Sequence, residues 1–195
     1  MSQQRSVRRR FGRQFFTKDA VTVSQSILGA YLVRRLPSGV LKKGKIVEVE
    51  AYIGPEDLAS HAKRNKKTER NKAEFYAGGH VYIYLVYGIY WQFNISTGPK
   101  DHPQCFLIRA IEPENSDDYK HTNGPGKLCG YFHLDKSLYG EDVTTSKRIW
   151  IEAGKKTPAK NIVASARIGI DYAGSYWAKR KLRFYIKGNK AISKL

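Results

Sequence analysis

The sequence predicts an α+β fold: a single β-rich domain with a curved, mostly antiparallel sheet, surrounding helices and a protruding β-hairpin. Apolar and polar residues alternate with a period of two in several segments, which is typical of half-buried strands. Turns rich in glycine and proline join these segments, where a parallel sheet would need regular crossover helices. We expect one domain over residues 15–195, because the 195-residue chain has no repeat, linker or break in composition.

The first 14 residues are predicted to form a flexible basic arm. Five arginines occur here: Arg5, Arg8, Arg9, Arg10 and Arg13. No apolar segment follows them, which argues against a secretory signal peptide and for an intracellular protein. We expect the arm to gather phosphates, and a merely solvated tail is the alternative.

The next segment, residues 15–36, resembles a capped helix. Its apolar residues recur at helical spacing: Val21, Ile27, Leu28 and Leu32. Thr17 or Ser24 is the candidate N-cap. Residues 37–39, with the sequence PSG, then predict a turn.

Residues 45–52 alternate as a strand. This pattern places Ile46, Glu48, Glu50 and Tyr52 on one face and Val47, Val49 and Ala51 on the other. Gly54 and Pro55 end the strand, and the basic run at residues 61–72 is expected to be an exposed loop or a short helix.

Residues 81–96 predict a β-hairpin around Gly88, with Tyr87 at its tip. An exposed aromatic side chain at a turn either packs against a neighbouring loop or inserts into a partner. Residues 104–111 predict another apolar strand, which Arg109 interrupts. Two more strands are expected at residues 148–152 and 182–186.

The charge of the chain indicates a polyanionic partner. Its 35 Lys and Arg residues and 17 Asp and Glu residues give a formal net charge of +18, and the pI is about 9.9. Nucleic acid is the first candidate and an anionic membrane surface the second. No apolar run approaches the roughly 20 residues of a membrane-spanning helix, so no insertion into a membrane is expected.

The cysteines and histidines give no support for a metal centre. Cys105 and Cys129 lack a C-x-x-C partner, and the five histidines form no H-E-x-x-H pattern. We therefore expect two reduced, packed thiols, no bound metal and no cofactor.

Glu50 is the candidate catalytic carboxylate, because an ionised acid in an apolar strand is costly unless it is paired or functional. The alternative is a surface residue paired with a lysine. Arg109 is either an internal salt-bridge partner or, together with Glu50, one side of a water site. The tyrosines of the hairpin are explained largely by sheet packing, with one or two expected to touch a ligand. The basic run is expected to contact phosphates.

Several blocks of the sequence resemble the alkyladenine (3-methyladenine) DNA glycosylase family. They are VEVEAYIGPEDLASH (47–61), TERN (68–71), VYIYLVYGIYWQFNIS (81–96), LIRAIEP (107–113), GPGKLC (124–129), and ARIGIDYAG (166–174) with LRFYIKG (182–188). The blocks stand in family order and cover nearly all of the chain from Phe15 onwards. The resemblance implies a monofunctional enzyme that flips a damaged purine out of double-stranded DNA and hydrolyses its N-glycosidic bond.

The resemblance also implies a role for each matched residue. Glu50 matches the base that activates water, and Arg109 its partner in positioning that water. Five residues match the pocket of the flipped base: Tyr52, His61, Tyr84, Asn94, and Ile168 through its backbone. Tyr87 matches the side chain that fills the gap in the DNA. The expected contacts to the DNA backbone are Lys63, Arg64, Lys66, Lys67, Arg70 and Lys127.

One position departs from the family pattern. Where an apolar residue usually intrudes beside the opposing DNA strand, this sequence has Glu74, and an acid near phosphates is unfavourable. Lesion preference, more than reaction type, is open for that reason, and the contact to the opposing strand is expected either to be lost or to be taken over by Phe75 or Tyr76. We expect a monomer, because one inserting tip and one pocket need no symmetry partner.

Two other classes of function stay open. A nuclease would use Glu48, Glu50 and Asp57 as ligands of Mg²⁺. A non-catalytic nucleic-acid-binding protein would use the basic face and the tyrosines, and Glu50 would be structural. Chelator sensitivity and the effect of Glu50→Gln distinguish these classes from a glycosylase.

Overall fold

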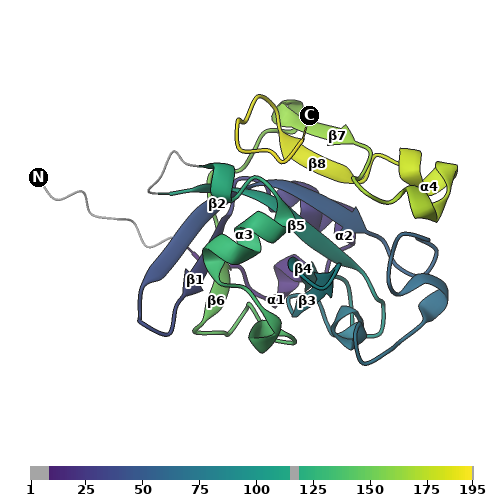
Figure 1. The fold of residues 1–195 in the computed structure, drawn as a ribbon, viewed down its shortest axis with the longest axis horizontal. Coiled ribbons are helices and arrows are strands. Elements are labelled where there is room, and N and C mark those ends of the chain that lie inside the picture. The colour runs from purple at the N-terminus through teal and green to yellow at the C-terminus, as the bar shows by residue number, and fades with distance from the viewer. Residues whose placement is uncertain (1–8, 115–118, 195) are drawn as a thin grey trace, which may run out of the picture.

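The computed structural model describes residues 9–114 and 119–194 and has the predicted α+β architecture (Figure 1). Eight strands form one open sheet in which every pairing is antiparallel. The strands are β1 (Tyr31–Arg35), β2 (Leu41–Tyr52), β3 (Val81–Val86), β4 (Tyr90–Ser96), β5 (Cys105–Pro113), β6 (Ile149–Glu152), β7 (Ile162–Ser165) and β8 (Arg183–Ile186). Their main order is β3-β4-β5-β2-β1-β6, and β8 pairs with both β2 and β7.

Three of the four α-helices described pack in the main core on one face of the sheet, and the fourth packs near Tyr52 through its Trp177. The α-helices are α1 (Arg13–Phe16), α2 (Ala20–Ser26), α3 (Pro125–Phe132) and α4 (Ser175–Lys179). Short 3₁₀ turns lie at Lys63–Asn65, Lys72–Phe75, Tyr119–His121, Lys136–Leu138, Ala159–Asn161 and Asp171–Ala173. Residues of α1, α2 and α3 share the main hydrophobic core with the inward residues of β2 to β5. Among the described residues, no helix is long and apolar enough to cross a bilayer.

The helix expected over residues 15–36 is wrong in extent. Two short helices occupy residues 13–26, and β1 follows them. Asp19, which was not a candidate cap, accepts a hydrogen bond from the Thr22 N–H at 2.9 Å. The helical part ends before Gly29, whose φ of +90° is not helical. A larger residue would not fit there, because an added Cβ would lie 2.6 Å from the Lys155 carbonyl oxygen. The apolar residues beyond it are buried in a strand.

Part of the stretch expected as a flexible basic arm, from Arg10 to Gln14, is packed on the domain. The Arg10 guanidinium donates to the Val143 carbonyl, and the Phe11 N–H donates to the Ile151 carbonyl at 3.0 Å. Arg13 lies in α1 and forms an ion pair with Asp142. Residues 1–8 lie outside the described part of the chain.

Paired irregularities in β2 and β5 decide which side chains face the site. Ile46 pairs with Ile111, Glu48 with Ala110 and Val49 with Ile108, so Val47 is an extra residue on β2 and Arg109 an extra residue on β5. The face prediction holds for Glu48, Glu50 and Tyr52. It is wrong for Ile46, which joins the main core, and for Val47, which packs with Ala110 and Ala191.

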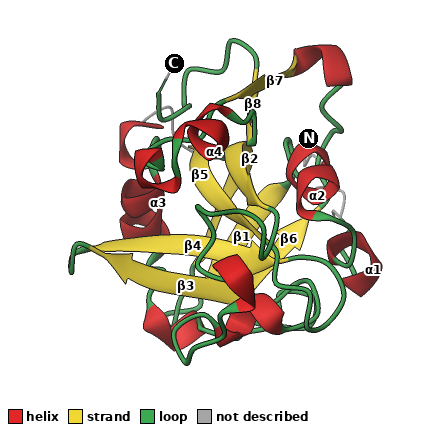
Figure 2. Cartoon of the chain, turned by 90° about the vertical axis from the view of Figure 1, so that its right-hand side faces the viewer, coloured by secondary structure: helices red, strands yellow, loops and turns green. Residues whose placement is uncertain are grey.

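The β3–β4 hairpin is confirmed and extends away from the body of the domain (Figure 2). The Ile89 N–H donates to the Val86 carbonyl, and Tyr87 and Gly88 both have positive φ values, +52° and +73°. This turn matches the twist of the two strands, but it is unfavourable for an aromatic residue. Backbone strain of this kind costs about 1–3 kcal/mol and clusters at functional sites.

Candidate active site

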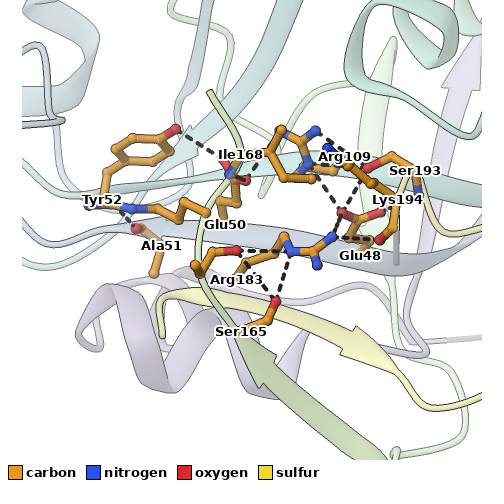
Figure 3. A network of polar contacts seen from close by, with 12 residues as sticks. Glu48, Glu50, Ala51, Tyr52, Arg109, Ser165, Ile168, Arg183, Ser193 and Lys194 are labelled. Carbon is orange, nitrogen blue, oxygen red and sulfur yellow. Dashed lines mark hydrogen bonds and ion pairs between the residues drawn. The ribbon is translucent and has the colours of Figure 1, made fainter. Parts of the chain in front are cut away.

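The Glu50 carboxylate is fully buried and held by three groups (Figure 3). Its Oε1 accepts a hydrogen bond from the Ile168 N–H at 2.8 Å and lies 3.2 Å from Arg109 Nη1. Its Oε2 accepts from the Tyr52 hydroxyl at 3.1 Å. Burial and the Glu50 charge raise the pKa of Tyr52 well above its usual value, so this hydroxyl keeps its proton and donates. An ionised, oriented carboxylate of this kind can accept a proton from water.

A second buried carboxylate, Glu48, holds Arg109 in place. Its Oε1 lies 3.2 Å from Arg109 Nε and 3.0 Å from Arg183 Nη1, and it also accepts from the Ser193 hydroxyl at 2.8 Å. Two arginines and two glutamates therefore form one network on the face of the sheet opposite the core (Figure 3). The sequence indicated Glu48 only as a metal ligand, and its positioning role was missed.

A buried ion pair between Arg167 and Asp57 packs against the ring of Tyr52. Arg167 donates to both oxygens of Asp57, at 2.6 and 2.8 Å, and both side chains are fully buried. The same guanidinium donates to the Ala51 carbonyl at 3.0 Å and lies 4.7 Å from the centre of the Tyr52 ring. Because Arg167 precedes Ile168, this pair also fixes the loop whose N–H holds Glu50.

Four aromatic residues connect a cleft with a small inner cavity. Both spaces are lined by Tyr52, His61, Tyr84 and Tyr172. The outer cleft has a volume of about 630 Å³ and includes Glu50, Arg109 and Ile168 in its wall. The inner cavity has about 30 Å³, and its remaining lining residues are Ala59, Glu74, Tyr82, Asn94 and Cys105. The five residues predicted for the base pocket thus meet around one connected space, and Tyr172 is an addition that no pattern had indicated.

His61 is held as a neutral imidazole. Its Nδ1 lies 2.6 Å from the Tyr82 hydroxyl, and its ring is 4.6 Å from that of Tyr84. Although His61 is exposed at the cleft, burial of its ring and the charges of Arg70 and Lys63 lower its pKa to about 4. If the Tyr82 hydroxyl donates to Nδ1, the imidazole proton lies on Nε2, where it is a hydrogen-bond donor.

Tyr87 lies at the hairpin tip as predicted and is 89% exposed. Its neighbours Ile89 and Tyr90 are 67% and 52% exposed. The tip borders the outer cleft, because Tyr87 and Gly88 are among its lining residues. An apolar side chain is therefore presented beside the wall that contains Glu50.

Contacts place two of the predicted cationic residues beside the cleft or the hairpin, and all six predicted cationic residues are exposed. They are Lys63, Arg64, Lys66, Lys67, Arg70 and Lys127. Arg70 lines the cleft, lies 5.5 Å from the Tyr84 ring and donates to the Leu85 carbonyl at 3.0 Å. Lys127 is in α3, where an added Cβ on Gly126 would lie 2.9 Å from Tyr90 in the hairpin. Arg70 therefore lies at the cleft and Lys127 next to the hairpin, while Lys67 lies 3.8 Å from Asp101.

Glu74 is not where the sequence pattern suggested. It is 1% exposed and lines the inner cavity, so it cannot lie beside phosphates on the surface. The 3₁₀ turn Lys72–Phe75 turns it inward with Ala73 and Phe75, which are also buried. Phe75 is buried as well, so the expectation that it takes over the contact to the opposing strand is wrong. Tyr76 is half-buried.

The arrangement of the carboxylates argues against the nuclease hypothesis. Asp57 is paired with Arg167, Glu48 with Arg109 and Arg183, and Glu50 with Arg109. Arginine cations thus occupy the oxygens that Mg²⁺ would need. Within the described ranges, no three or more His, Cys, Asp and Glu side chains are grouped so that they could hold a metal ion.

The chain is similar to known proteins over most of its length. The family model described as methylpurine-DNA glycosylase matches residues 14–190. The chain is 37% identical to the human DNA-3-methyladenine glycosylase over 205 residues, covering 94% of this chain and 68% of the human protein. It is 42% identical to a putative 3-methyladenine DNA glycosylase of Clostridium novyi, with 95% of this chain and 99% of the relative covered. A relative of the same description from Bdellovibrio bacteriovorus is 40% identical, with 93% and 97% covered.

These matches confirm the family that the sequence blocks indicated, and they extend across the strands, the hairpin and the loop that carries Ile168. The non-catalytic alternative is excluded at the same time, because the family is one of hydrolases that act on N-glycosidic bonds in DNA. The chain belongs to the methylpurine-DNA glycosylase family and is a DNA N-glycosylase.

Proposed function

We propose that this glycosylase flips alkylated or deaminated purines out of duplex DNA and hydrolyses their N-glycosidic bond with a water molecule activated by Glu50. The proposed substrates are 3-methyladenine, 7-methylguanine, hypoxanthine and ethenoadenine, and the product is an abasic site. The observation that carries the proposal is the fully buried Glu50 carboxylate in the wall of an aromatic cleft, held by Arg109 and the Ile168 N–H.

In the proposed reaction, a water molecule lies between Glu50 and the sugar. Glu50 accepts a proton from the water as the water oxygen bonds to C1′, and the C1′–N9 bond breaks with its electron pair leaving on the purine. Positive charge develops on the sugar ring, and the nearby carboxylate stabilises it. Arg109 orients Glu50, and Glu48 holds Arg109.

The flipped base is proposed to lie among Tyr52, His61 and Tyr84. Stacking on aromatic faces contributes about 1–3 kcal/mol per base, which offsets the few kcal/mol that flipping costs. A cationic alkylated purine gains further stabilisation from the electron-rich rings. Asn94, at the inner cavity, is proposed to crowd the amino group of a guanine.

Tyr87 is proposed to fill the gap that the flipped nucleotide leaves. Its exposure at a strained turn beside the cleft supports this role. The six exposed cations, of which Arg70 lines the cleft, are proposed to bind phosphates, which adds affinity without reading sequence. We propose that the enzyme acts as a monomer on intracellular DNA, with the glycosylase domain over residues 15–195.

The test uses excess protein, EDTA and duplexes that each carry one of the four lesions. After the reaction, alkali converts abasic sites into strand breaks. We expect alkali-dependent cleavage at the lesion alone, and its loss in Glu50→Gln. Glu69→Gln is the matched control, because Glu69 is an exposed carboxylate outside the site. Cleavage without alkali, or only after Mg²⁺ is restored, would contradict the proposal.

A further inference from the structure

The buried carboxyl group of Glu74 has an oxygen without a partner. Its Oε1 accepts a hydrogen bond from Cys105 Sγ at 3.4 Å. Its Oε2 has no hydrogen-bond partner, because the neighbouring Asn71 amide donates instead to the His61 and Lys66 carbonyls, at 3.1 and 2.9 Å. Few buried side-chain polar atoms of the described residues lack a hydrogen-bond partner. Of the residues that carry such atoms, only Glu74 lines the inner cavity. Leaving a buried polar atom unpaired is costly, so such an atom indicates either strain or a missing ligand.

No cation of the described residues forms an ion pair with this carboxyl group. The titratable groups that act on it or share its cavity are Tyr52, Asp57, His61, Tyr82, Tyr84, Cys105, Tyr139 and Tyr172. His61 is neutral at pH 7, and the nearby Arg167 cation is paired with Asp57. Burial, with a smaller effect of the Asp57 charge, raises the pKa of Glu74 to about 8. At neutral pH the group is therefore mainly protonated and able to donate. Because Oε1 accepts from the thiol, the proton belongs on Oε2.

The shape of the site places the edge of a base near this oxygen. A cavity of about 30 Å³ has room for one water molecule or one substituent of a ring, but not for a purine. The ring would lie among the aromatic residues shared with the outer cleft, with a polar edge directed inwards. The other buried polar groups there are engaged, since the Tyr82 hydroxyl pairs with His61 and Asn94 Nδ2 donates to the Gln92 carbonyl.

We propose that Glu74 is a specificity-determining residue, which donates a hydrogen bond from Oε2 to an acceptor on the inward edge of a neutral flipped purine, such as the keto oxygen of hypoxanthine. This inference rests on the proposed function. It gives the residue that departs from the family pattern a role in selecting deaminated purines. A site that offers a buried donor discriminates against a base that lacks the matching acceptor, because the donor is then left unpaired.

Two variants and two duplexes test the inference. Glu74→Gln keeps a neutral donor at the position of Oε2, whereas Glu74→Met keeps the length and removes it. One duplex carries hypoxanthine, and the other carries unsubstituted purine, which lacks the 6-oxygen. Single-turnover excision is measured for both, and the affinity for both is measured in the Glu50→Gln background, so that slow chemistry does not hide a binding difference.

We expect Glu74→Met to lower excision of hypoxanthine about tenfold, the effect of roughly one lost hydrogen bond, and to leave the purine duplex unchanged. Glu74→Gln should stay within about threefold of the wild type. Wild-type excision of hypoxanthine should also decline above about pH 8, in a step that Glu74→Gln lacks. Both variants should melt at or above the wild-type temperature, because they remove an unpaired buried carboxyl group.

Three results would overturn the inference. The first is an equal effect of Glu74→Met on both duplexes, the second is no effect on either, and the third is a loss in Glu74→Gln as large as in Glu74→Met. These outcomes are distinct from failure of the proposed function, in which the wild-type enzyme would excise neither hypoxanthine nor any other purine lesion.

Discussion

The Arg167–Asp57 pair joins the proposed base pocket to the proposed catalytic carboxylate, Glu50, and Asp57→Asn tests how strongly it does so. Both side chains are fully buried, and their two contacts are 2.6 and 2.8 Å. Asp57→Asn removes the carboxylate charge and leaves the buried Arg167 cation without a counter-charge. The Nε of Arg167 already lacks a hydrogen-bond partner, so it makes no contact that would offset the loss. Breaking a buried pair in this way costs about 3–5 kcal/mol.

The assay is urea unfolding followed by fluorescence or circular dichroism. With an m-value of about 2–3 kcal/mol/M for a domain of this size, we expect the midpoint to fall by about 1–2 M. Excision by the folded fraction should fall as well, because Arg167 stacks on Tyr52 and precedes Ile168. Glu69→Gln breaks an exposed ion pair with Lys72 and should not measurably shift the midpoint. A shift in Asp57→Asn no larger than in this control would refute the reasoning.

Three further predictions concern the hairpin tip, the arginine network and pH. Tyr87→Asn should be at least as stable as the wild type, since Asn tolerates positive φ. Its affinity for a lesion duplex, measured by filter binding, should fall about 5- to 100-fold. Unchanged affinity would contradict insertion of Tyr87 into the DNA. Glu48→Gln should slow single-turnover excision about tenfold or more with little change in Kd, because Arg109 loses its anchor; an unchanged rate would exclude this positioning role. Glu74 has a folded-state pKa near 8 and an ordinary value near 4.5, so its contribution to stability is present at low pH and is lost as pH rises through this window, by up to about 5 kcal/mol. Thermal melts of Glu74→Met should lack this slope, and an identical slope would contradict the assignment.

The sheet was largely predictable from the sequence because alternation reports burial directly. The strand that carries Glu50, the strand interrupted by Arg109 and the hairpin with Tyr87 at its tip all occur where the pattern placed them. Their chemical roles came from the resemblance of several blocks to one family, since a lone acid in a strand has an equally good structural explanation.

The remaining features depend on tertiary contacts that a pattern does not carry. β1 was predicted as helix because its apolar residues fit both periods, although Gly29 was a usable sign of the break. The helix α3 was missed despite Pro125 at its first turn, which is a common start signal. The extra residues Val47 and Arg109 change the faces of two strands, and alternation alone does not reveal such a change. Glu74 lies inside because a 3₁₀ turn reverses the chain there.

The most direct test of the account measures single-turnover excision and binding of one hypoxanthine duplex by the wild type and by Glu50→Gln, both with EDTA present. Glu50 is held by Arg109, Tyr52 and Ile168, so the neutral amide should keep the shape of the site while losing the ability to accept a proton. We expect the rate constant to fall by about 10²–10⁴-fold, with Kd within about threefold of the wild type. A rate constant within tenfold of the wild type, at unchanged affinity, would contradict the assignment of Glu50 as the group that activates water.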